Sequence, residues 1–246
     1  MSRMKVTAII QARMGSTRLP GKVLHDVAGR TMLARVCRRA ARAALVDELL
    51  VATTTEAVDD AIAAACLELG VPCFRGAEHD VLERYRAAAE AYGADAVVRI
   101  TADCPLIDAE LIDNVVVAML RHHPDYAANV LCRTYPRGLD VEVATRAALE
   151  CAAREATEPY QRAHVMPYFY QHPERFRLRS VTGDEDQSEH RWTVDSPEDL
   201  ELVRDIYRRL GGSDDFSWRD VLRLVERHPA LAAVNRNVRQ KHFVEG

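Results

Sequence analysis

The segment Val6-Thr7-Ala8-Ile9-Ile10-Gln11-Ala12-Arg13-Met14-Gly15-Ser16-Thr17-Arg18-Leu19-Pro20-Gly21-Lys22 joins a short apolar run to a loop that is rich in cations and glycine. The run Val6–Ile10 is almost continuously apolar, which is typical of a strand covered on both faces of a sheet. In open α/β folds the loop after such a strand lies at the carboxyl edge of the sheet, where ligands bind. Glycine lets the backbone approach a ligand closely, and cations offset the charge of a polyphosphate. The segment therefore predicts an α/β protein whose first loop binds phosphate, chiefly through Arg13, Arg18 and Lys22.

Two common phosphate-binding motifs do not describe this loop. A Walker loop has four residues between its glycines and a Ser or Thr after its lysine, whereas five residues separate Gly15 from Gly21 and Val23 follows Lys22. A dinucleotide fingerprint would need the pattern G-x-G-x-x-G, which the loop lacks. On spacing alone, a solvated basic loop without a ligand remains the alternative.

Beyond the loop, short apolar runs alternate with longer segments whose apolar residues have helical spacing. This alternation predicts right-handed crossovers and a mainly parallel sheet flanked by helices. The predicted strands are Val6–Ile10, Leu49–Thr53, Cys73–Phe74 and Ala96–Thr101, and the predicted helices are Met32–Ala44, Val58–Leu69, Val81–Tyr92 and Asp108–Leu120.

Residues 125–181 are less regular, and we interpret them as an insertion that shapes half of a cleft or a subunit contact. Its predicted strands are Tyr126–Leu131, Leu139–Val143 and Phe176–Val181, and its predicted helices are Arg146–Glu155 and Tyr160–His172. Further along, the sequence predicts a last strand, two helices and a loose polar tail, which are Trp192–Val194, Pro197–Leu210, Trp218–Arg227 and Asn235–Gly246. Because no repeat, linker or domain boundary is evident, residues 1–246 are expected to form one domain.

Two aspartates follow predicted strands at the edge that carries the loop. Asp103 comes just after the fourth predicted strand, and Asp195 comes just after the last one. Two carboxylates at one edge suit Mg²⁺, which combines one or two carboxylates with phosphate oxygens and water. For Asp103, an ordinary turn before proline is an equally good interpretation. Ser196 and Asp199 match a helix cap and need no further function, which leaves Asp195 free for a metal.

Composition restricts the classes of function. The 246 residues are 48% hydrophobic, which allows one sizeable core. A formal net charge of −4 argues against a nucleic-acid partner, which would favour a basic excess. Six cysteines without a CxxC pair indicate buried thiols in a reducing compartment rather than zinc ligands. No signal sequence and no run of roughly 20 apolar residues is found, so we expect a soluble, cytoplasmic protein without a membrane partner.

The loop and several later motifs resemble one enzyme superfamily. The opening Ile9–Leu24 is similar, nearly residue for residue, to the spore coat polysaccharide biosynthesis protein F branch of the cytidylyltransferase superfamily. It is also similar to the nucleotide loop of the KDO and acylneuraminate cytidylyltransferases. The supporting motifs are Phe74-Arg75-Gly76, Asp80-Val81-Leu82-Glu83-Arg84-Tyr85, Arg99-Ile100-Thr101-Ala102-Asp103-Cys104-Pro105-Leu106, Tyr135-Pro136-Arg137-Gly138-Leu139-Asp140-Val141-Glu142 and Arg191-Trp192-Thr193-Val194-Asp195.

This resemblance implies a nucleotide-diphospho-sugar transferase fold and a Mg²⁺-dependent reaction with CTP, often carried out by a homodimer. An acceptor hydroxyl, expected to belong to a sugar acid, would attack the α-phosphorus of CTP and give a CMP-linked product and pyrophosphate. By the same resemblance, the triphosphate would be held by Arg13, Arg18 and Lys22, and the metal by Asp103 and Asp195. Further nucleotide contacts would come from Ala12, Gly15, Ser16, Thr53 and Arg75. The acceptor half would contain Arg133, Arg137 and His164.

Other functions remain open on the sequence. A glycosyltransferase of similar fold would use a nucleotide-sugar, and Asp184-Glu185-Asp186 matches its Asp-x-Asp metal motif, although this stretch lies in a polar run typical of an exposed loop. A sugar-1-phosphate nucleotidyltransferase using UTP or dTTP would have a longer glycine-rich loop. A non-catalytic CTP-binding module would leave the two aspartates unexplained. A phosphonate or another small acceptor is the alternative to a sugar acid.

Overall fold

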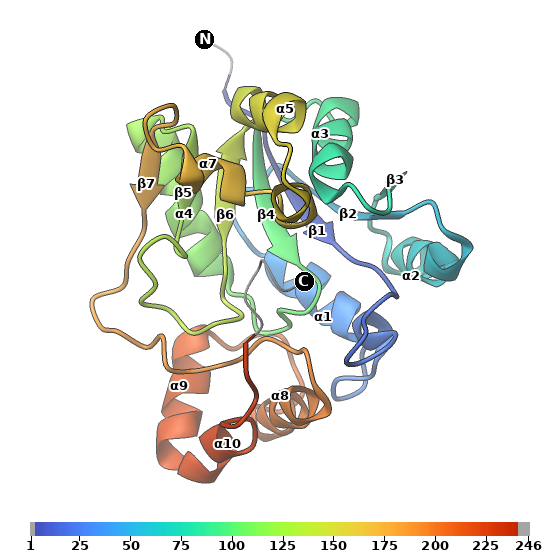
Figure 1. The fold of residues 1–246 in the computed structure, drawn as a ribbon. Coiled ribbons are helices and arrows are strands. Elements are labelled where there is room, and N and C mark those ends of the chain that lie inside the picture. Colours follow the sequence, from blue (N-terminus) through green and yellow to red (C-terminus); the bar gives the residue numbers. More distant parts are fainter. Residues whose placement is uncertain (1–2, 241–246) are drawn as a thin grey trace.

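A computed structural model describes residues 3–240, and within them one mixed sheet runs in the order β3-β2-β1-β4-β6-β5-β7 (Figure 1). Strands β1 to β4 pair in parallel, β6 is antiparallel to both neighbours, and β7 is parallel to β5. The expected α/β class with a mainly parallel sheet is therefore confirmed. The strands are β1 (Val6–Gln11), β2 (Glu48–Thr54), β3 (Cys73–Gly76), β4 (Ala96–Thr101), β5 (Tyr126–Ala128), β6 (Glu142–Thr145) and β7 (Leu178–Ser180).

Helices cover both faces of the sheet, and the residues of β1 alternate between two apolar cores. Ala8 and Ile10 are buried in a cluster that includes side chains of α1 (Met32–Ala40) and α4 (Ala109–His122). Ile9, between them, is buried in a second cluster with side chains of α3 (Val81–Ala91) and α5 (Arg146–Glu155). Because alternate residues of a strand face opposite sides of a sheet, burial on both faces requires the nearly unbroken apolar run.

The remaining helices follow β1 or β2, lie along the insertion, or stand near the end of the described chain. Figure 1 shows α8, α9 and α10 grouped beyond the carboxyl ends of β1 and β4. The first loop begins at the same end of the sheet. The bounds are η1 (Lys22–Leu24), η2 (Ala57–Asp59), α2 (Asp60–Leu69), α6 (Pro159–His164), α7 (Pro167–Gln171), α8 (Pro197–Arg209), α9 (Trp218–Arg227) and α10 (Pro229–Ala233).

Two predicted helices differ from the structure for local reasons. The helix predicted to reach Ala44 ends at Ala40, and the backbone N–H groups of Ala44 and Leu45 instead donate to the Asp113 carboxylate at 2.9 and 2.8 Å. The single helix predicted over Tyr160–His172 is divided into α6 and α7. The break occurs where Val165 has a φ of +71° and proline begins α7.

Within the insertion, the strand predicted over Leu139–Val143 lies later, at Glu142–Thr145. The Asn129 side chain explains the shift, because its amide donates to the Leu139 carbonyl at 2.7 Å and accepts from the Val141 N–H at 2.8 Å. At these residues the backbone therefore forms its hydrogen bonds with a side chain instead of with a neighbouring strand. The other two predicted strands are present but shorter, as β5 and β7.

Trp192–Val194 does not form a strand, so that prediction is wrong. Only an isolated bridge links Arg191 to Arg137, and the Val194 N–H donates to the Asp103 carbonyl at 2.8 Å. The prediction of a loose tail over Asn235–Gly246 is also corrected for the part that the structure describes, residues 235–240. Asn235 is buried and hydrogen-bonded, while residues 241–246 lie outside the described part of the chain.

Among residues 3–240, none of the helices has both the length and the apolar character that crossing a lipid bilayer demands.

Candidate functional site

The first loop folds back on itself at the carboxyl edge of the sheet. The N–H groups of Ser16 and Gly21 both donate to the Met14 carbonyl, at 2.8 and 3.1 Å. Gly21 has a φ of +67°, which glycine adopts without the steric cost that other residues meet. The Met14 N–H in turn donates to the carboxylate of Asp59, a buried residue beyond β2, at 2.7 Å. These contacts fix the path of the loop and direct the next residue, Lys22, into the protein.

Lys22 is buried, and its ammonium group joins three parts of the chain. Nζ lies 2.8 Å from Asp103 Oδ2, 2.8 Å from Asp195 Oδ1 and 2.8 Å from the Val194 carbonyl. Burial alone lowers the pKa of Lys22, but the two nearby carboxylates outweigh it, and the net pKa is raised. The three contacts match the three N–H donors of an ammonium group. Lys22 therefore holds the two predicted metal ligands together and has no donor left over in this arrangement.

Asp103 and Asp195 are brought together by backbone contacts as well as by Lys22. Asp103 follows β4, and its carbonyl accepts from the Val194 N–H at 2.8 Å and from the Thr193 hydroxyl at 3.2 Å. Burial tends to raise the pKa of Asp103, yet the charge and hydrogen bond of Lys22 lower it overall. Asp103 is thus held as an anion beside Asp195.

Asp195 is surrounded by further cations. Its Oδ2 lies 3.1 Å from Arg18 and 3.0 Å from Arg191, which is only about a tenth exposed. The next residues form the predicted capping box of α8, in which the Ser196 hydroxyl accepts from the Asp199 N–H. Asp199 has a second role that the cap does not explain, since its carboxylate grips the Arg191 guanidinium at 2.9 and 3.0 Å.

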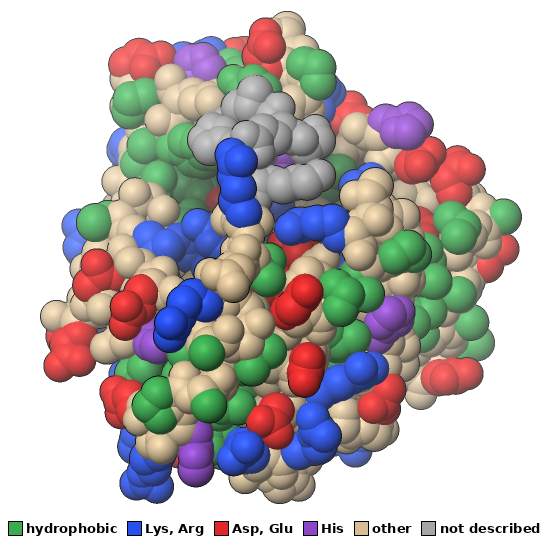
Figure 2. Space-filling model, turned by 60° about the horizontal axis from the view of Figure 1, so that its bottom comes forward, with side chains coloured by type: hydrophobic (Ala, Val, Ile, Leu, Met, Phe, Trp, Pro, Cys, Tyr) green, Lys and Arg blue, Asp and Glu red, His purple; other side chains and the backbone are tan. Residues whose placement is uncertain are grey.

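The other loop residues lie around this centre. Arg13 is exposed and has no hydrogen-bonding or ionic partner within residues 3–240, so its guanidinium is available to a ligand. Gly15 is exposed, with open space where a side chain would be. The Ser16 hydroxyl accepts from the Leu19 N–H at 3.3 Å, which stabilises the turn. On the face in Figure 2, basic side chains gather near the middle with acidic side chains beside them.

Three residues predicted to contact the nucleotide are either buried or already bonded to other parts of the protein. The Ala12 N–H donates to the Ala52 carbonyl at 3.2 Å, and Thr53 is fully buried. The Arg75 guanidinium bonds the Thr54 and Glu56 carbonyls and the Asp60 carboxylate, at 2.9, 3.0 and 2.6 Å. Arg75 thus ties the end of β2 to the start of α2. A role for Ala12, Thr53 and Arg75 in nucleotide binding stays a prediction.

In the predicted acceptor half, two arginines differ in their partners. Arg133 forms a two-pronged ion pair with Asp140 at 2.6 and 2.9 Å. Arg137 is partly buried, and its guanidinium has no partner among the described residues. Burial lowers the pKa of Arg137, and the charges of Arg133 and Arg191 lower it further. Among the described residues Arg137 is therefore an unpaired cation near Asp140 and Asp195, a position suited to an anionic ligand.

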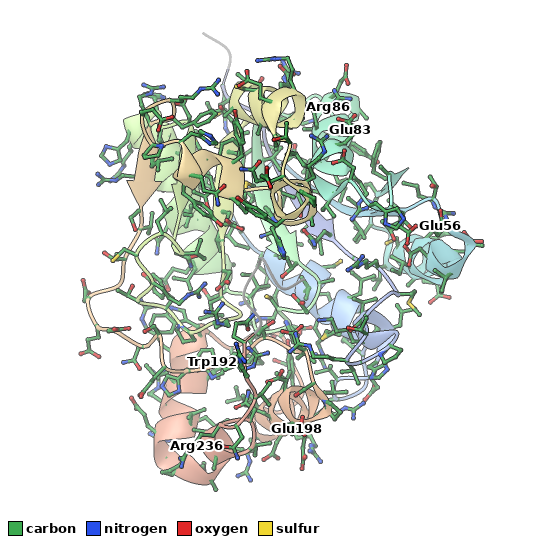
Figure 3. The ribbon with its side chains drawn as sticks, in the orientation of Figure 1. Glu56, Glu83, Arg86, Trp192, Glu198 and Arg236 are labelled. Carbon is green, nitrogen blue, oxygen red and sulfur yellow. The ribbon has the colours of Figure 1, made fainter. Side chains whose placement is uncertain are left out.

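Backbone contacts position Arg137. Its N–H donates to the His190 carbonyl at 2.9 Å, and its carbonyl accepts from the Trp192 N–H at 2.7 Å. Gly138, the next residue, has a φ of +106°, and a β-carbon there would lie 2.5 Å from the Trp192 carbonyl carbon. Figure 3 shows Trp192 between the sheet and the helices at the end of the chain. Only glycine allows the two segments to approach this closely.

We expect Gly138→Ala to lower the free energy of unfolding by at least about 2 kcal/mol, because a strained φ and a backbone overlap add together. Urea denaturation would measure the change. Gly15→Ala is the control, since nothing lies within 4 Å of a β-carbon there, and it should change stability by no more than about 0.5 kcal/mol. Equal stability of the two variants would contradict this account of Gly138.

The donor set at this edge fits a divalent cation. Within residues 3–240 no three or more His, Cys, Asp and Glu side chains form a metal cluster, so the protein offers the two aspartates alone. Mg²⁺ commonly takes one or two carboxylates and completes its shell with substrate phosphates and water. Asp103 and Asp195 therefore suit a metal that arrives with a phosphate ligand. By contrast, Asp184 and Asp186 of the Asp-x-Asp stretch are exposed, as the sequence predicted for that loop.

A parallel sheet edge that brings a cationic loop against two aspartates is suited to binding a nucleoside triphosphate together with a divalent metal, as a nucleotidyltransferase requires. The chain belongs to the cytidylyltransferase family, whose model matches residues 7–220. The expected CTP-dependent nucleotidyltransferase is thereby confirmed at the level of the family. The spore coat polysaccharide biosynthesis protein SpsF of Bacillus subtilis is 33% identical over 231 residues, which are 91% of this chain and 95% of SpsF.

Solved structures agree with this assignment. A cytidylyltransferase from Leptospira borgpetersenii has a TM-score of 0.90 and 34% identity, covering 98% of this chain and 100% of that one. CMP:2-keto-3-deoxy-manno-octonic acid synthetase, solved in complex with CTP, has a TM-score of 0.65 and 21% identity over 84% of this chain and 99% of its own. At this level of identity, the similarity to the second structure shows a shared fold. The expected nucleotide-diphospho-sugar transferase fold is confirmed.

Several site residues were not predicted as such from the sequence. The sequence motif that contains Arg191 predicts no role for this residue, and a helix cap is all that the sequence predicts for Asp199. Asp59 and Asn235 carry no local signal, because their partners lie far away in the sequence. Only the folded chain reveals these contacts.

Proposed function

We propose that this protein transfers the CMP group of CTP to a hydroxyl of a sugar acid and releases pyrophosphate. The observation that carries the proposal is the contact of Lys22 with both Asp103 and Asp195. Beside it lies a loop whose Arg13 side chain has no partner within residues 3–240. This arrangement combines carboxylates for a metal with cations for a triphosphate. We include Mg²⁺ as the metal, a homodimer and a cytoplasmic location in the proposal, with residues 125–181 supplying the acceptor half or the subunit contact.

The acceptor class is supported by charge and by relatives. Within the described residues the Arg137 guanidinium has no partner, which suits a carboxylate because its donors can bind both oxygens. A 3-deoxy-manno-octulosonate cytidylyltransferase of Geobacter sulfurreducens is 40% identical over 118 residues, which are 47% of this chain and 46% of that protein. Its name includes a sugar acid as the acceptor, and we extend that chemical class to this chain.

The reaction is an in-line displacement at phosphorus, in which positioning and charge do most of the work. The acceptor oxygen forms a bond to the α-phosphorus, the bond to the bridging oxygen breaks, and pyrophosphate departs with that electron pair. The acceptor proton passes to solvent. A bound Mg²⁺ would supply charge neutralisation on the phosphate oxygens, with Asp103 and Asp195 as its protein ligands. Arg13 and Arg18 would stabilise the charge that develops on the leaving group. Lys22 would contribute its positive charge while its three donors hold Asp103, Asp195 and the Val194 carbonyl.

Release of pyrophosphate tests the proposal. The purified chain is incubated with Mg²⁺, each of CTP, UTP, ATP and GTP, and a panel of sugar acids, phosphonates and neutral sugars. We expect release with CTP that depends on a sugar acid. Preference for another nucleotide would overturn the assignment of CTP, and dependence on a phosphonate or a neutral sugar would overturn that of the acceptor. Binding of CTP without turnover would support a binding module instead.

Replacing Arg137 by glutamine is expected to raise the KM for the sugar acid roughly 10- to 100-fold, the value of a hydrogen bond to a charged group. The KM for CTP should change little, because the triphosphate is assigned to the first loop. Steady-state kinetics with each substrate varied in turn would measure the two KM values separately. Arg179→Gln, at an exposed position of β7, is the control and should behave like the wild type. A rise in the KM for CTP with no rise in that for the sugar acid would assign Arg137 to the nucleotide, and an equal rise in both would refute a role confined to the acceptor.

A further inference from the structure

The segment after α10 returns to the candidate site. Asn235 is only 5% exposed, and its side-chain nitrogen donates to the Arg191 carbonyl at 2.9 Å and to Asp199 Oδ1 at 2.8 Å. Both partners can only accept hydrogen bonds, so the nitrogen of the amide, rather than its oxygen, must face them. A residue near the end of the described chain therefore contacts two residues that surround Asp195.

Asp199 and Arg191 continue this chain of contacts to the metal ligand. Asp199 is fully buried, and its carboxylate accepts two hydrogen bonds from the Arg191 guanidinium at 2.9 and 3.0 Å. The same carboxylate accepts from the Asp195 backbone N–H at 2.9 Å. Arg191 Nη2 then reaches Asp195 Oδ2 at 3.0 Å. Asp195 is thus held at its backbone by Asp199 and at its carboxylate by Arg191.

The helix cap does not account for Asn235. A capping box needs the Asp199 side chain only to reach back to the Ser196 N–H, and this bond is present at 3.1 Å. Asn235 instead binds the other oxygen of Asp199 and the backbone of Arg191. It fixes Arg191 from both ends, by its carbonyl directly and by its guanidinium through Asp199.

We propose that Asn235 is a positioning residue that orients Asp195 toward the metal through Asp199 and Arg191. This inference rests on the proposed function, in which Asp195 is a metal ligand. Partners that orient a ligand typically change metal affinity or activity by roughly 10- to 100-fold when they are removed. Without Asn235, Asp199 loses one donor, the Arg191 carbonyl loses its partner, and the guanidinium is less firmly held against Asp195.

The test measures metal binding directly. Mn²⁺ with CTP is titrated into the full chain without acceptor, and water-proton relaxation reports the metal bound to the slowly tumbling protein. We expect Asn235→Ala to weaken this binding about tenfold or more. Asn237→Ala, at an exposed asparagine two residues away, is the matched control and should bind Mn²⁺ like the wild type. Thermal denaturation is recorded for each variant.

A second variant keeps the test decisive if Asn235→Ala does not fold. Arg191→Lys retains the charge but lacks the planar fork whose Nε and Nη2 bind Asp199 while Nη2 also reaches Asp195, so it should weaken Mn²⁺ binding similarly. When both variants fold, adding Asn235→Ala to Arg191→Lys should cause no further loss, because the two act in one chain of contacts. Wild-type Mn²⁺ affinity in folded Asn235→Ala, or in Arg191→Lys, would overturn the inference. A wild-type chain that releases no pyrophosphate from CTP would instead refute the proposed function.

Discussion

Replacing Lys22 by alanine is expected to lower turnover about 100- to 1000-fold, the usual cost of losing one preorganised charged or hydrogen-bonding group at a developing charge. Lys22 contacts both aspartates and the Val194 carbonyl, each at 2.8 Å, so its removal separates the groups that form the site. The two carboxylates would then repel each other without a cation between them. The kcat for pyrophosphate release from CTP measures the loss.

Lys5→Ala is the matched control for this variant. Lys5 precedes the same strand, β1, at its opposite end, and it pairs with Glu48 on the surface at 2.8 Å. Its replacement should leave kcat within about twofold of the wild type, because an exposed ion pair contributes little. Far-ultraviolet circular dichroism would establish that both variants are folded. A folded Lys22→Ala protein with the turnover of Lys5→Ala would refute the assigned role of Lys22.

Asp103→Asn and Asp195→Asn should each reduce kcat at least about 100-fold, since each removes one of the two carboxylates assigned to the metal. Asparagine keeps the shape of the side chain but not its charge. In either variant Lys22 retains one carboxylate partner, so we expect both proteins to fold. A higher Mn²⁺ concentration for half-maximal activity would connect the loss to the metal.

Asp184→Asn provides the control for the aspartate variants and tests the rival interpretation. Asp184 is exposed and begins the Asp-x-Asp stretch that a glycosyltransferase would use. Under the proposed function its replacement should leave turnover unchanged. If Asp184→Asn abolished activity while Asp103→Asn did not, the metal site would lie in that loop and the glycosyltransferase would be favoured.

The sequence predicted those parts of the fold and site that depend on local patterns or on a common sheet edge. The apolar β1 run and the cationic loop are local, and Asp103 follows a recognisable strand. Asp195 was placed correctly at the same edge, although the strand assigned before it does not exist. The sequence Trp192-Thr193-Val194 has the same pattern in a strand as in a segment held by a single bridge, so the sequence alone does not separate the two.

Contacts between distant polar residues could not be predicted in this way. The amide of Asn129 displaces a strand, and that of Asn235 binds Arg191 and Asp199 in a segment that the sequence predicts as a loose tail. The local sequence around each asparagine gives no sign that the side chain is buried rather than exposed. Their roles follow from the acceptors that the fold brings near them, because a buried polar group must find a partner.

The contact between Lys22 and Asp195 also has a consequence for the time at which the protein acquires its site. The two residues are separated by 173 positions in the chain. A ribosome adding roughly 5 to 20 residues per second needs on the order of ten seconds or more to cover that distance. The β1 strand and its loop are therefore synthesised long before their charge partner, and the nascent chain holds an uncompensated lysine until Asp103 and then Asp195 emerge. Assembly of the site is a late event in synthesis, whereas the parallel strands around it can pair earlier.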